Sequence, residues 1–166
     1  MTRFAMFDTA LGAAYATADE GGALSGLYFV RARHAPEIAA AWTRCAATDA
    51  PFAECARQLD EYFAGRRRSF TLPLAARGTA FQRRVWREIA AIPFGETISY
   101  AALAERAGAP GAARAAGAAT GRNPWSVIVP CHRVLGGRGE LTGYAGGLDR
   151  KLRLLTLEGA LPAVAA

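Results

Sequence analysis

The sequence contains few of the residues that build metal sites and disulfide frameworks. Of its 166 residues, only three are cysteines and two are histidines, His34 and His132. Cys45, Cys55 and Cys131 cannot all pair with one another, and no Cys/His group has the spacing of a zinc site. We therefore expect free thiols in a reducing compartment, the cytoplasm, and neither a metal nor any other cofactor.

Long apolar runs and a secretory opening are also missing. Arg3, Asp8, Asp19 and Glu20 interrupt the first twenty residues, and no stretch is apolar for the length that a bilayer span requires. These features predict that no membrane is a partner of this chain.

Lysine is nearly absent, since Lys151 is the single lysine among 20 basic residues, yet the net charge is +6. Residues 1–75 carry eight Arg against eight Asp and Glu, whereas residues 76–166 carry 12 basic and six acidic residues. A neutral part followed by a basic part predicts two domains, 1–75 and 76–166, of which the second meets a polyanion. The alternative is an Arg- and Ala-rich composition, although such a bias would not by itself confine the excess charge to one part.

The first part has the pattern of a small α/β domain. Short runs that are alternating or apolar predict three strands, at residues 3–8, 13–18 and 23–30, and Glu20-Gly21-Gly22 predicts a hairpin turn. Periodic apolar positions predict two helices, at residues 36–45 and 52–63. Residues 69–74 are interpreted as a returning edge strand. Nothing in this part forms a catalytic constellation.

The second part is predicted to be mostly helical. Thr79 and Gln82 have the capping-box spacing at the start of a helix that Pro93 ends. Ser99 caps a second helix, the stretch 108–110 breaks it, and a third helix follows at 111–119. Two helices around a glycine-containing break in a basic region are the pattern of a helix-turn-helix.

The third of these helices has unusual side chains. From Gly111 to Ala119 each side chain is a hydrogen or a methyl group, apart from Arg114. A helix that reads base sequence in the major groove needs several longer polar side chains. This helix suits binding that ignores sequence, with one cation pushed into the duplex. A small-residue helix packed on a neighbour, with Arg114 as a surface charge, would explain the same pattern.

The heptapeptide 128–134 holds the candidate nucleophile, Cys131. Proline before the cysteine fixes the direction in which the chain leaves its apolar run. His132 and Arg133 follow the thiol, and both can stabilise a thiolate, which is the nucleophilic form of cysteine. The alternative is a small buried cysteine after a strand.

The C-terminal stretch adds two charged candidates and a glycine-rich loop. Lys151 and Glu158 lie seven residues apart on one face of a helix predicted at 149–157, and a surface salt bridge is the plain explanation for Lys151. Glu158 has a further possible role as the carboxylate that orients His132 in a nucleophile–base–acid arrangement. Before this helix, the loop 142–148 contains adjacent glycines whose backbone can approach a flat ligand closely.

Several motifs from Phe81 to Gly159 together resemble the 6-O-alkylguanine-DNA alkyltransferases (methylated-DNA–protein-cysteine methyltransferases). The motifs, in order, are Phe81-Gln82-x-x-Val85-Trp86, Ile92-Pro93-x-Gly95, Ser99-Tyr100-x-x-Leu103-Ala104, Ala113-Arg114-Ala115-x-Gly117, Asn123-Pro124, Pro130-Cys131-His132-Arg133-Val134, Thr142-Gly143-Tyr144-Ala145-Gly146-Gly147-Leu148 and Leu154-Leu155-x-x-Glu158-Gly159. Residues 1–75 match the N-terminal domain of the family only loosely.

The resemblance implies a fold and an activity. The expected fold is an α/β N-terminal domain, ribonuclease H-like, with a small antiparallel sheet plus helices. A mostly α, winged-helix-like C-terminal domain with a helix-turn-helix follows. The implied protein is a monomer that binds double-stranded DNA containing alkylated guanine in the minor groove and flips the damaged base. The alkyl group then moves irreversibly to Cys131, with one turnover per molecule.

The resemblance also implies roles for individual residues. Cys131 is the alkyl acceptor, His132 acts through a water as its base, Glu158 orients the imidazole, and Asn123 holds the turn before the active site. Tyr100 hydrogen-bonds the flipped base, Arg114 fills the gap that the base leaves, and the Ala145 N–H donates toward the departing oxygen. The full set of substrate-binding residues implied in this way is Tyr100, Arg114, Val134, Ala145, Gly146 and Lys151.

Some features depart from the family or leave alternatives open. Ala145 stands where some members have serine, and Trp125 and Ser126 are expected near the pocket entrance. Three other functions remain to be weighed: a lesion-binding protein without chemistry, a Cys-His hydrolase and a transcription factor. Cys131 argues against the first. A Cys-His hydrolase would leave the smooth helix and the basic residues 76–166 unexplained. The shortage of base-reading side chains disfavours a transcription factor.

Overall fold

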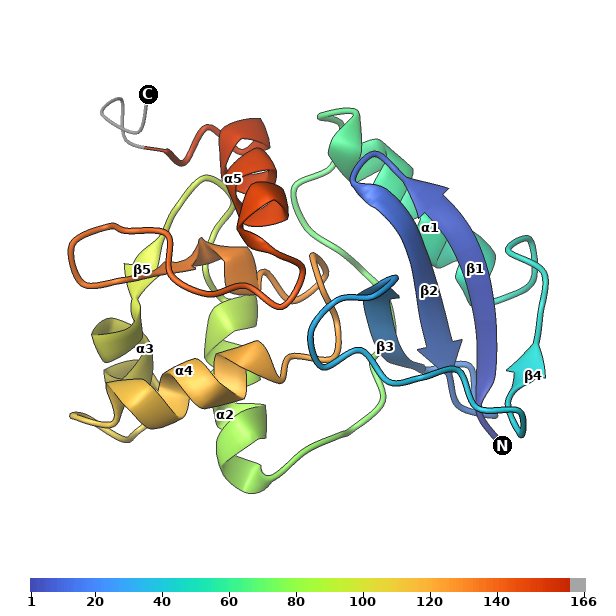
Figure 1. Ribbon diagram of the computed structural model, residues 1–166, viewed down its shortest axis with the longest axis horizontal. Helices are drawn as coiled ribbons and strands as arrows, with labels where there is room; N and C mark the ends of the chain where they lie inside the picture. The colour runs from blue at the N-terminus through green and yellow to red at the C-terminus, as the bar shows by residue number, and fades with distance from the viewer. Residues whose placement is uncertain (162–166) are drawn as a thin grey trace. The chain divides into compact units, whose positions relative to one another are not determined.

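The computed structural model describes residues 1–161, which divide into two compact units (Figure 1). The first unit comprises Met1–Arg77 together with Pro124–Ile128, and the second comprises Gly78–Asn123 and the chain from Val129 onward. The short segment 124–128 therefore packs with a part of the chain that lies far from it in sequence.

The first unit contains a four-stranded sheet in the order β3-β2-β1-β4. The strands are β1 (Arg3–Thr9), β2 (Gly12–Ala18), β3 (Leu24–Phe29) and β4 (Thr43–Arg44). The three predicted strands are confirmed within one residue at each end, and β1–β2 and β2–β3 pair antiparallel. Because β4 pairs parallel to β1, the sheet is mixed and not purely antiparallel as expected.

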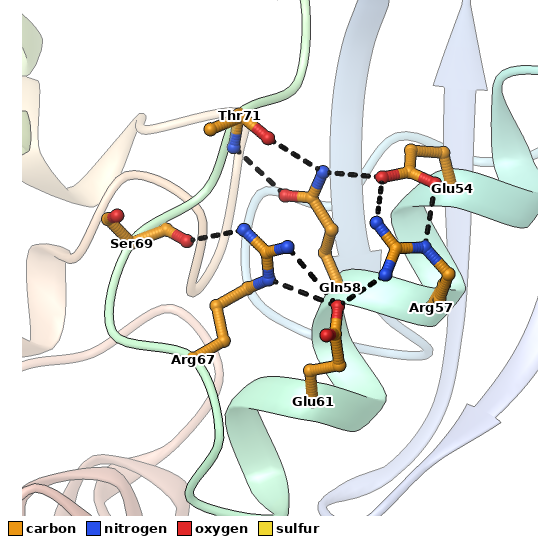
Figure 2. Close-up of polar contacts among 7 residues, drawn as sticks. All are labelled: Glu54, Arg57, Gln58, Glu61, Arg67, Ser69 and Thr71. Carbon is orange, nitrogen blue, oxygen red and sulfur yellow. Dashed lines mark hydrogen bonds and ion pairs between the residues drawn. The ribbon is translucent and has the colours of Figure 1, made fainter.

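Helix α1 (Phe52–Phe63) buries the predicted stripe of Phe52, Cys55 and Leu59. Figure 2 shows the polar network on this helix, which joins Glu54, Arg57, Gln58, Glu61, Arg67, Ser69 and Thr71. Gln58 is fully buried, and its amide donates to the Thr71 hydroxyl (3.0 Å) and accepts from the Thr71 N–H (2.9 Å). These bonds tie the extended chain after α1 to the helix. Arg67 has a structural role in the same network, because it pairs with Glu61.

Two sequence predictions for the first unit are wrong. No helix forms at residues 36–45; instead β4 lies along the edge of β1, where the Cys45 N–H donates to the Phe4 carbonyl (2.8 Å). The open edge of β1 needs hydrogen-bond partners, and this need outweighs a weak helical pattern. Residues 69–74 form only an isolated bridge, Leu24–Leu74, because Pro73 has no N–H with which to continue a ladder. The described part of this unit thus has one α-helix where two were expected.

The described part of the second unit contains four α-helices: α2 (Ala80–Ala90), α3 (Tyr100–Arg106), α4 (Ala113–Gly121) and α5 (Leu148–Leu157). A short parallel pair, β5 (Ile98–Ser99) with β6 (Val134–Leu135), and a 3-10 turn η1 (Cys131–Arg133) complete it. The capping box is confirmed, since Thr79 and Gln82 exchange side-chain bonds with each other's backbone N–H. Ser99 caps α3 as predicted.

The core of this unit explains the small residues of α4. Val85, Trp86 and Ile89 are buried on α2, and the Trp86 indole N–H donates to the Ala119 carbonyl (2.8 Å). Ala116 and Ala119 are buried, whereas Arg114 is exposed on the same helix. One face of α4 is therefore a packing face, and the other is a smooth surface that carries a single cation. None of the helices formed by residues 1–161 has the length and apolar character needed to cross a bilayer.

Candidate active site

Cys131 lies directly after a tight turn at the end of an apolar stretch. Pro130 has φ −80° and ψ 65°, and the Cys131 N–H donates to the Val129 carbonyl (2.8 Å), which makes an inverse γ-turn. The 3-10 turn η1 then leads into β6, whose pairing with β5 brings Val134 opposite Ile98. The Cys131 side chain is only 5% exposed.

His132 and Glu158 are in direct contact. The Nε2 of His132 and the Oε2 of Glu158 are 2.8 Å apart, and both side chains are fully buried. A carboxylate only accepts, so Nε2 carries the hydrogen and the Nδ1 of a neutral ring is left with a lone pair. That Nδ1 is buried and has no hydrogen-bond partner among residues 1–161. Burial, opposed by the hydrogen bond to Glu158, lowers the pKa of His132, which leaves a neutral imidazole able to accept a proton.

Arg133 does not stabilise a thiolate, contrary to the expectation from its position after Cys131. Its Nε and Nη2 donate to the two oxygens of Glu158 at 2.8 and 2.9 Å, and its Nη1 donates to the Ile92 carbonyl (2.6 Å). Glu158 is thus shared between an imidazole and a bidentate guanidinium. Sequence reasoning related Arg133 to the thiol and missed its contact with Glu158; its place directly after His132 was the signal that pointed to the site.

The thiol of Cys131 is not primed as a thiolate in the free protein. Burial raises its pKa, while a hydrogen bond from Asn123 and the charge of Lys151 act in the opposite direction. Because the raised pKa keeps the thiol protonated near neutrality, nucleophilic chemistry at Cys131 requires a base. Asn123 is buried beside it and donates from Nδ2 to the Val129 carbonyl (2.8 Å), which fixes the turn before the cysteine.

Lys151 is buried, and the surface salt bridge expected with Glu158 does not form. Its ammonium group donates to the carbonyls of Val134 (2.7 Å), Thr142 (3.1 Å) and Gly143 (3.1 Å). Burial lowers the pKa of Lys151 to about 8. The ammonium also lies 6.0 Å from the centroid of the Tyr100 ring, whose hydroxyl donates to the Thr142 carbonyl (3.2 Å). Lys151 therefore ties the loop after β6 to the strand itself.

The remaining candidates lie in different surroundings. Val134 and Gly146 are buried, Ala145 is half-buried in the loop before α5, and Arg114 is exposed on α4. Trp125, expected near the pocket entrance, belongs to the first unit. It is buried in the first unit, where its indole N–H donates to the Leu24 carbonyl (2.8 Å). Among residues 1–161, no group of three or more His, Cys, Asp and Glu side chains is arranged to hold a metal ion.

The buried ammonium of Lys151 predicts a specific pH dependence of stability. Its pKa is about 8 in the folded protein and near 10.5 in the unfolded chain, so between these values the unfolded chain holds more protons. The free energy of unfolding of the wild type should therefore rise with pH from 8 to 10.5, relative to Lys151→Met. Urea unfolding of both proteins across this range measures the difference. Arg153→Met, an exposed change on the same helix, is the control. It keeps Lys151, so the difference in the free energy of unfolding between this variant and the wild type should not change from pH 8 to 10.5.

Two family models match the chain. Residues 80–160 match the DNA binding domain of 6-O-methylguanine DNA methyltransferase, and residues 3–76 match its ribonuclease-like domain. The two matches together cover most of the chain and fall on the helical part and the sheet-containing part respectively.

Curated relatives and solved structures are similar to the chain along much of its length. The methylated-DNA–protein-cysteine methyltransferase of Mycolicibacterium paratuberculosis is 59% identical over 107 residues, covering 64% of this chain and 65% of that relative. The protein of the same name from Methanosarcina acetivorans is 44% identical over 157 residues, covering 95% and 98%. A Mycobacterium tuberculosis protein crystallised in complex with DNA superimposes with a TM-score of 0.85 at 43% identity, covering 97% of this chain and 96% of that one.

Proposed function

Because the chain belongs to the 6-O-methylguanine DNA methyltransferase family, we propose that it repairs DNA by moving the alkyl group of 6-O-alkylguanine onto its own Cys131. The observation that carries the proposal is the buried Cys131-His132-Glu158 arrangement, in which a cysteine with a protonated thiol directly precedes a histidine whose neutral imidazole is held by a carboxylate. The protein is thus a methylated-DNA–protein-cysteine methyltransferase.

The chemistry begins with the proton of the thiol. The free Nδ1 lone pair of His132 takes this proton through a water molecule, and Glu158 stabilises the imidazolium that forms. The thiolate attacks the saturated carbon of the alkyl group, so a C–S bond forms as the C–O bond breaks. The electron pair of the broken bond stays with the guanine, which takes up one proton and leaves as ordinary guanine.

The leaving oxygen gains negative charge during this displacement, and donors aimed at it stabilise the transition state. We assign this role to the Ala145 N–H, and we assign binding of the guanine to Tyr100 and to the backbone of Val134 and Gly146. Lys151 holds the loop that contains Ala145 in place through its carbonyl contacts. No group in this set displaces a thioether, so each molecule reacts once.

DNA binding is assigned to the second predicted domain, residues 76–166, which carries the excess positive charge. In this proposal α3 and α4 are the helix-turn-helix of a winged-helix-like domain, and the smooth face of α4 enters the minor groove of double-stranded DNA. A guanine inside the stack is out of reach of a buried thiol, so the damaged base is flipped out and Arg114 fills the gap. The protein acts as a monomer in the cytoplasm.

Mass measurement tests the proposal directly. The protein is incubated with a duplex that contains one 6-O-methylguanine and is then digested, and the peptides are weighed. The Cys131 peptide should gain the mass of one methyl group in proportion to the lesion supplied, up to one per protein molecule. The Cys45 and Cys55 peptides and an undamaged duplex are controls that should show no gain. A Cys131 peptide without methyl, or more lesions repaired than protein molecules present, would overturn the proposal.

A further inference from the structure

Residues 144–147 form a tight turn directly before α5. The Gly147 N–H donates to the Tyr144 carbonyl (2.9 Å), so Ala145 and Gly146 are the central residues of a β-turn. The next bond along the chain, from the Lys151 N–H to the Gly147 carbonyl (3.1 Å), belongs to the start of α5. The turn that contains the Ala145 N–H is therefore joined directly to a helix.

The side chain of Arg150, in the first turn of α5, holds this β-turn from the helix. Its Nη1 donates to the Gly146 carbonyl (2.9 Å); Gly146 is buried and Arg150 is half-buried. A hydrogen bond from a charged donor is about twice as strong as one between neutral groups. The peptide group that joins Gly146 to Gly147 is thus fixed at both ends, by the guanidinium at its carbonyl and by the Tyr144 carbonyl at its N–H.

These two bonds form a chain that ends at the Ala145 N–H. The Tyr144 carbonyl and the Ala145 N–H belong to one trans peptide group, in which they point in opposite directions. The guanidinium of Arg150 therefore donates to peptide group 146–147, which in turn donates to peptide group 144–145. Each bond in such a chain polarises the next and makes the following N–H a better donor. Among residues 1–161 no acceptor receives the Ala145 N–H, so this last donor is available to a ligand.

We propose that Arg150 is a positioning residue for the alkyl transfer, which directs and strengthens the Ala145 N–H through two peptide groups. The inference rests on the proposed function, in which this N–H donates to the leaving oxygen of guanine. A donor aimed at the place where charge develops stabilises the transition state more than the bound substrate. Arg150 touches no reacting atom itself and acts on the leaving oxygen through backbone groups alone.

The hydrogen-bond chain is tested in the free protein by amide hydrogen exchange. Arg150→Met removes the charged donor and keeps a long side chain with good helix propensity. The Gly147 amide should exchange about tenfold faster in this variant, because peptide group 146–147 has lost the bond at its carbonyl. The Gly136 amide is the internal control, since its bond to the Glu140 carbonyl (3.0 Å) lies in another loop of the same unit. Its exchange rate should not change.

The effect on the reaction is tested by single-turnover methyl transfer from a duplex that contains one 6-O-methylguanine. The rate at saturating duplex should be about tenfold lower in Arg150→Met, because the donor to the leaving oxygen is weakened and not removed. The duplex concentration that gives half of this rate should stay at the wild-type value. Iodoacetamide should also modify Cys131 of the free variant at the wild-type rate, because iodide leaves without a donor at a guanine oxygen. Arg153→Met, the same exchange at an exposed position of α5, should match the wild type in every measurement.

Each result supports or overturns the inference. Wild-type exchange of the Gly147 amide in Arg150→Met, or a wild-type rate at saturating duplex, overturns it. A higher half-saturating concentration with an unchanged maximal rate would make Arg150 a DNA contact instead. Slower modification of Cys131 by iodoacetamide, or failure of the variant to fold, would give Arg150 a general structural role and also overturn the inference. Absence of methyl transfer in the wild type would refute the proposed function, whereas faster Gly147 exchange in Arg150→Met would still establish the hydrogen-bond chain.

Discussion

Replacing Cys131 by alanine is expected to abolish methyl transfer completely while leaving binding to the damaged duplex intact. The change removes one buried sulfur, and no other thiol has a comparable setting. Cys55 is fully buried on α1, where burial raises its pKa to about 12, and Cys45 lies beside β4. Without a nucleophile, the imidazole of His132 has no proton to remove, so the chemical step does not occur.

A gel-shift titration and the peptide-mass measurement on the same preparation provide the two readouts. Cys131→Ser is the closely matched control, since its hydroxyl occupies almost the same space but is a far weaker nucleophile at neutral pH. It should bind DNA as the wild type does and also transfer nothing.

Three results would contradict this interpretation of Cys131. Methyl transfer by the alanine variant to Cys45 or Cys55 would place the chemistry elsewhere. Loss of duplex binding together with transfer would make Cys131 a structural residue. Turnover of an ester substrate by the wild type would favour a Cys-His hydrolase. If Cys131→Ala binds the damaged duplex without methyl transfer while the wild type gains a methyl group, the protein is not a lesion-binding protein that lacks chemistry.

Changing Glu158 to glutamine should be the most destabilising single substitution in the active site. The Glu158 carboxylate accepts two bonds from the buried Arg133 guanidinium and one from His132. An amide has one accepting oxygen, and its NH2 group would face a donor. Loss of the charge leaves Arg133 buried without compensation, which costs about 3–5 kcal/mol of folding free energy. Urea unfolding at neutral pH measures this loss.

A second variant shows whether the uncompensated charge is the cause. Adding Arg133→Met to Glu158→Gln removes the stranded guanidinium, and the double variant should recover a large part of the lost stability. Glu54→Gln is the control, because its pair with Arg57 is solvent-exposed and should contribute far less. A double variant no more stable than Glu158→Gln would show that the loss comes from His132 or from packing.

The Arg133–Glu158 pair has a consequence for the base. Glu158 must stay ionised and aimed at Nε2 if the imidazole is to present its lone pair at Nδ1. Arg133 holds the carboxylate from its other side and is itself fixed by the Ile92 carbonyl and the face of the Phe94 ring, 5.8 Å away. The histidine is thus oriented by a network of which the carboxylate is only the middle member.

The sequence by itself determined those features that depend on residues a few positions apart. The capping box of Thr79 and Gln82, the cap at Ser99 and the buried stripe of α1 all follow from the period of a helix and its unpaired N-terminal N–H groups. Cys131 and His132 are consecutive residues, so their proximity also follows from the sequence. The family motifs, whose side chains are distinctive, singled out Glu158 and Asn123 as well.

Only the tertiary structure decided the features whose partners are backbone groups from distant parts of the chain. Lys151 is buried because three carbonyls converge on its ammonium, and a carbonyl has no signature in a sequence. Thr43 and Arg44, within the stretch expected to be a helix, pair with the edge of β1, and the Trp125 indole donates to the Leu24 carbonyl 101 residues away. Every residue carries the same C=O, and every residue except proline carries the same N–H, so which of these groups pair is determined by the packing of the whole chain and not by the local side-chain pattern.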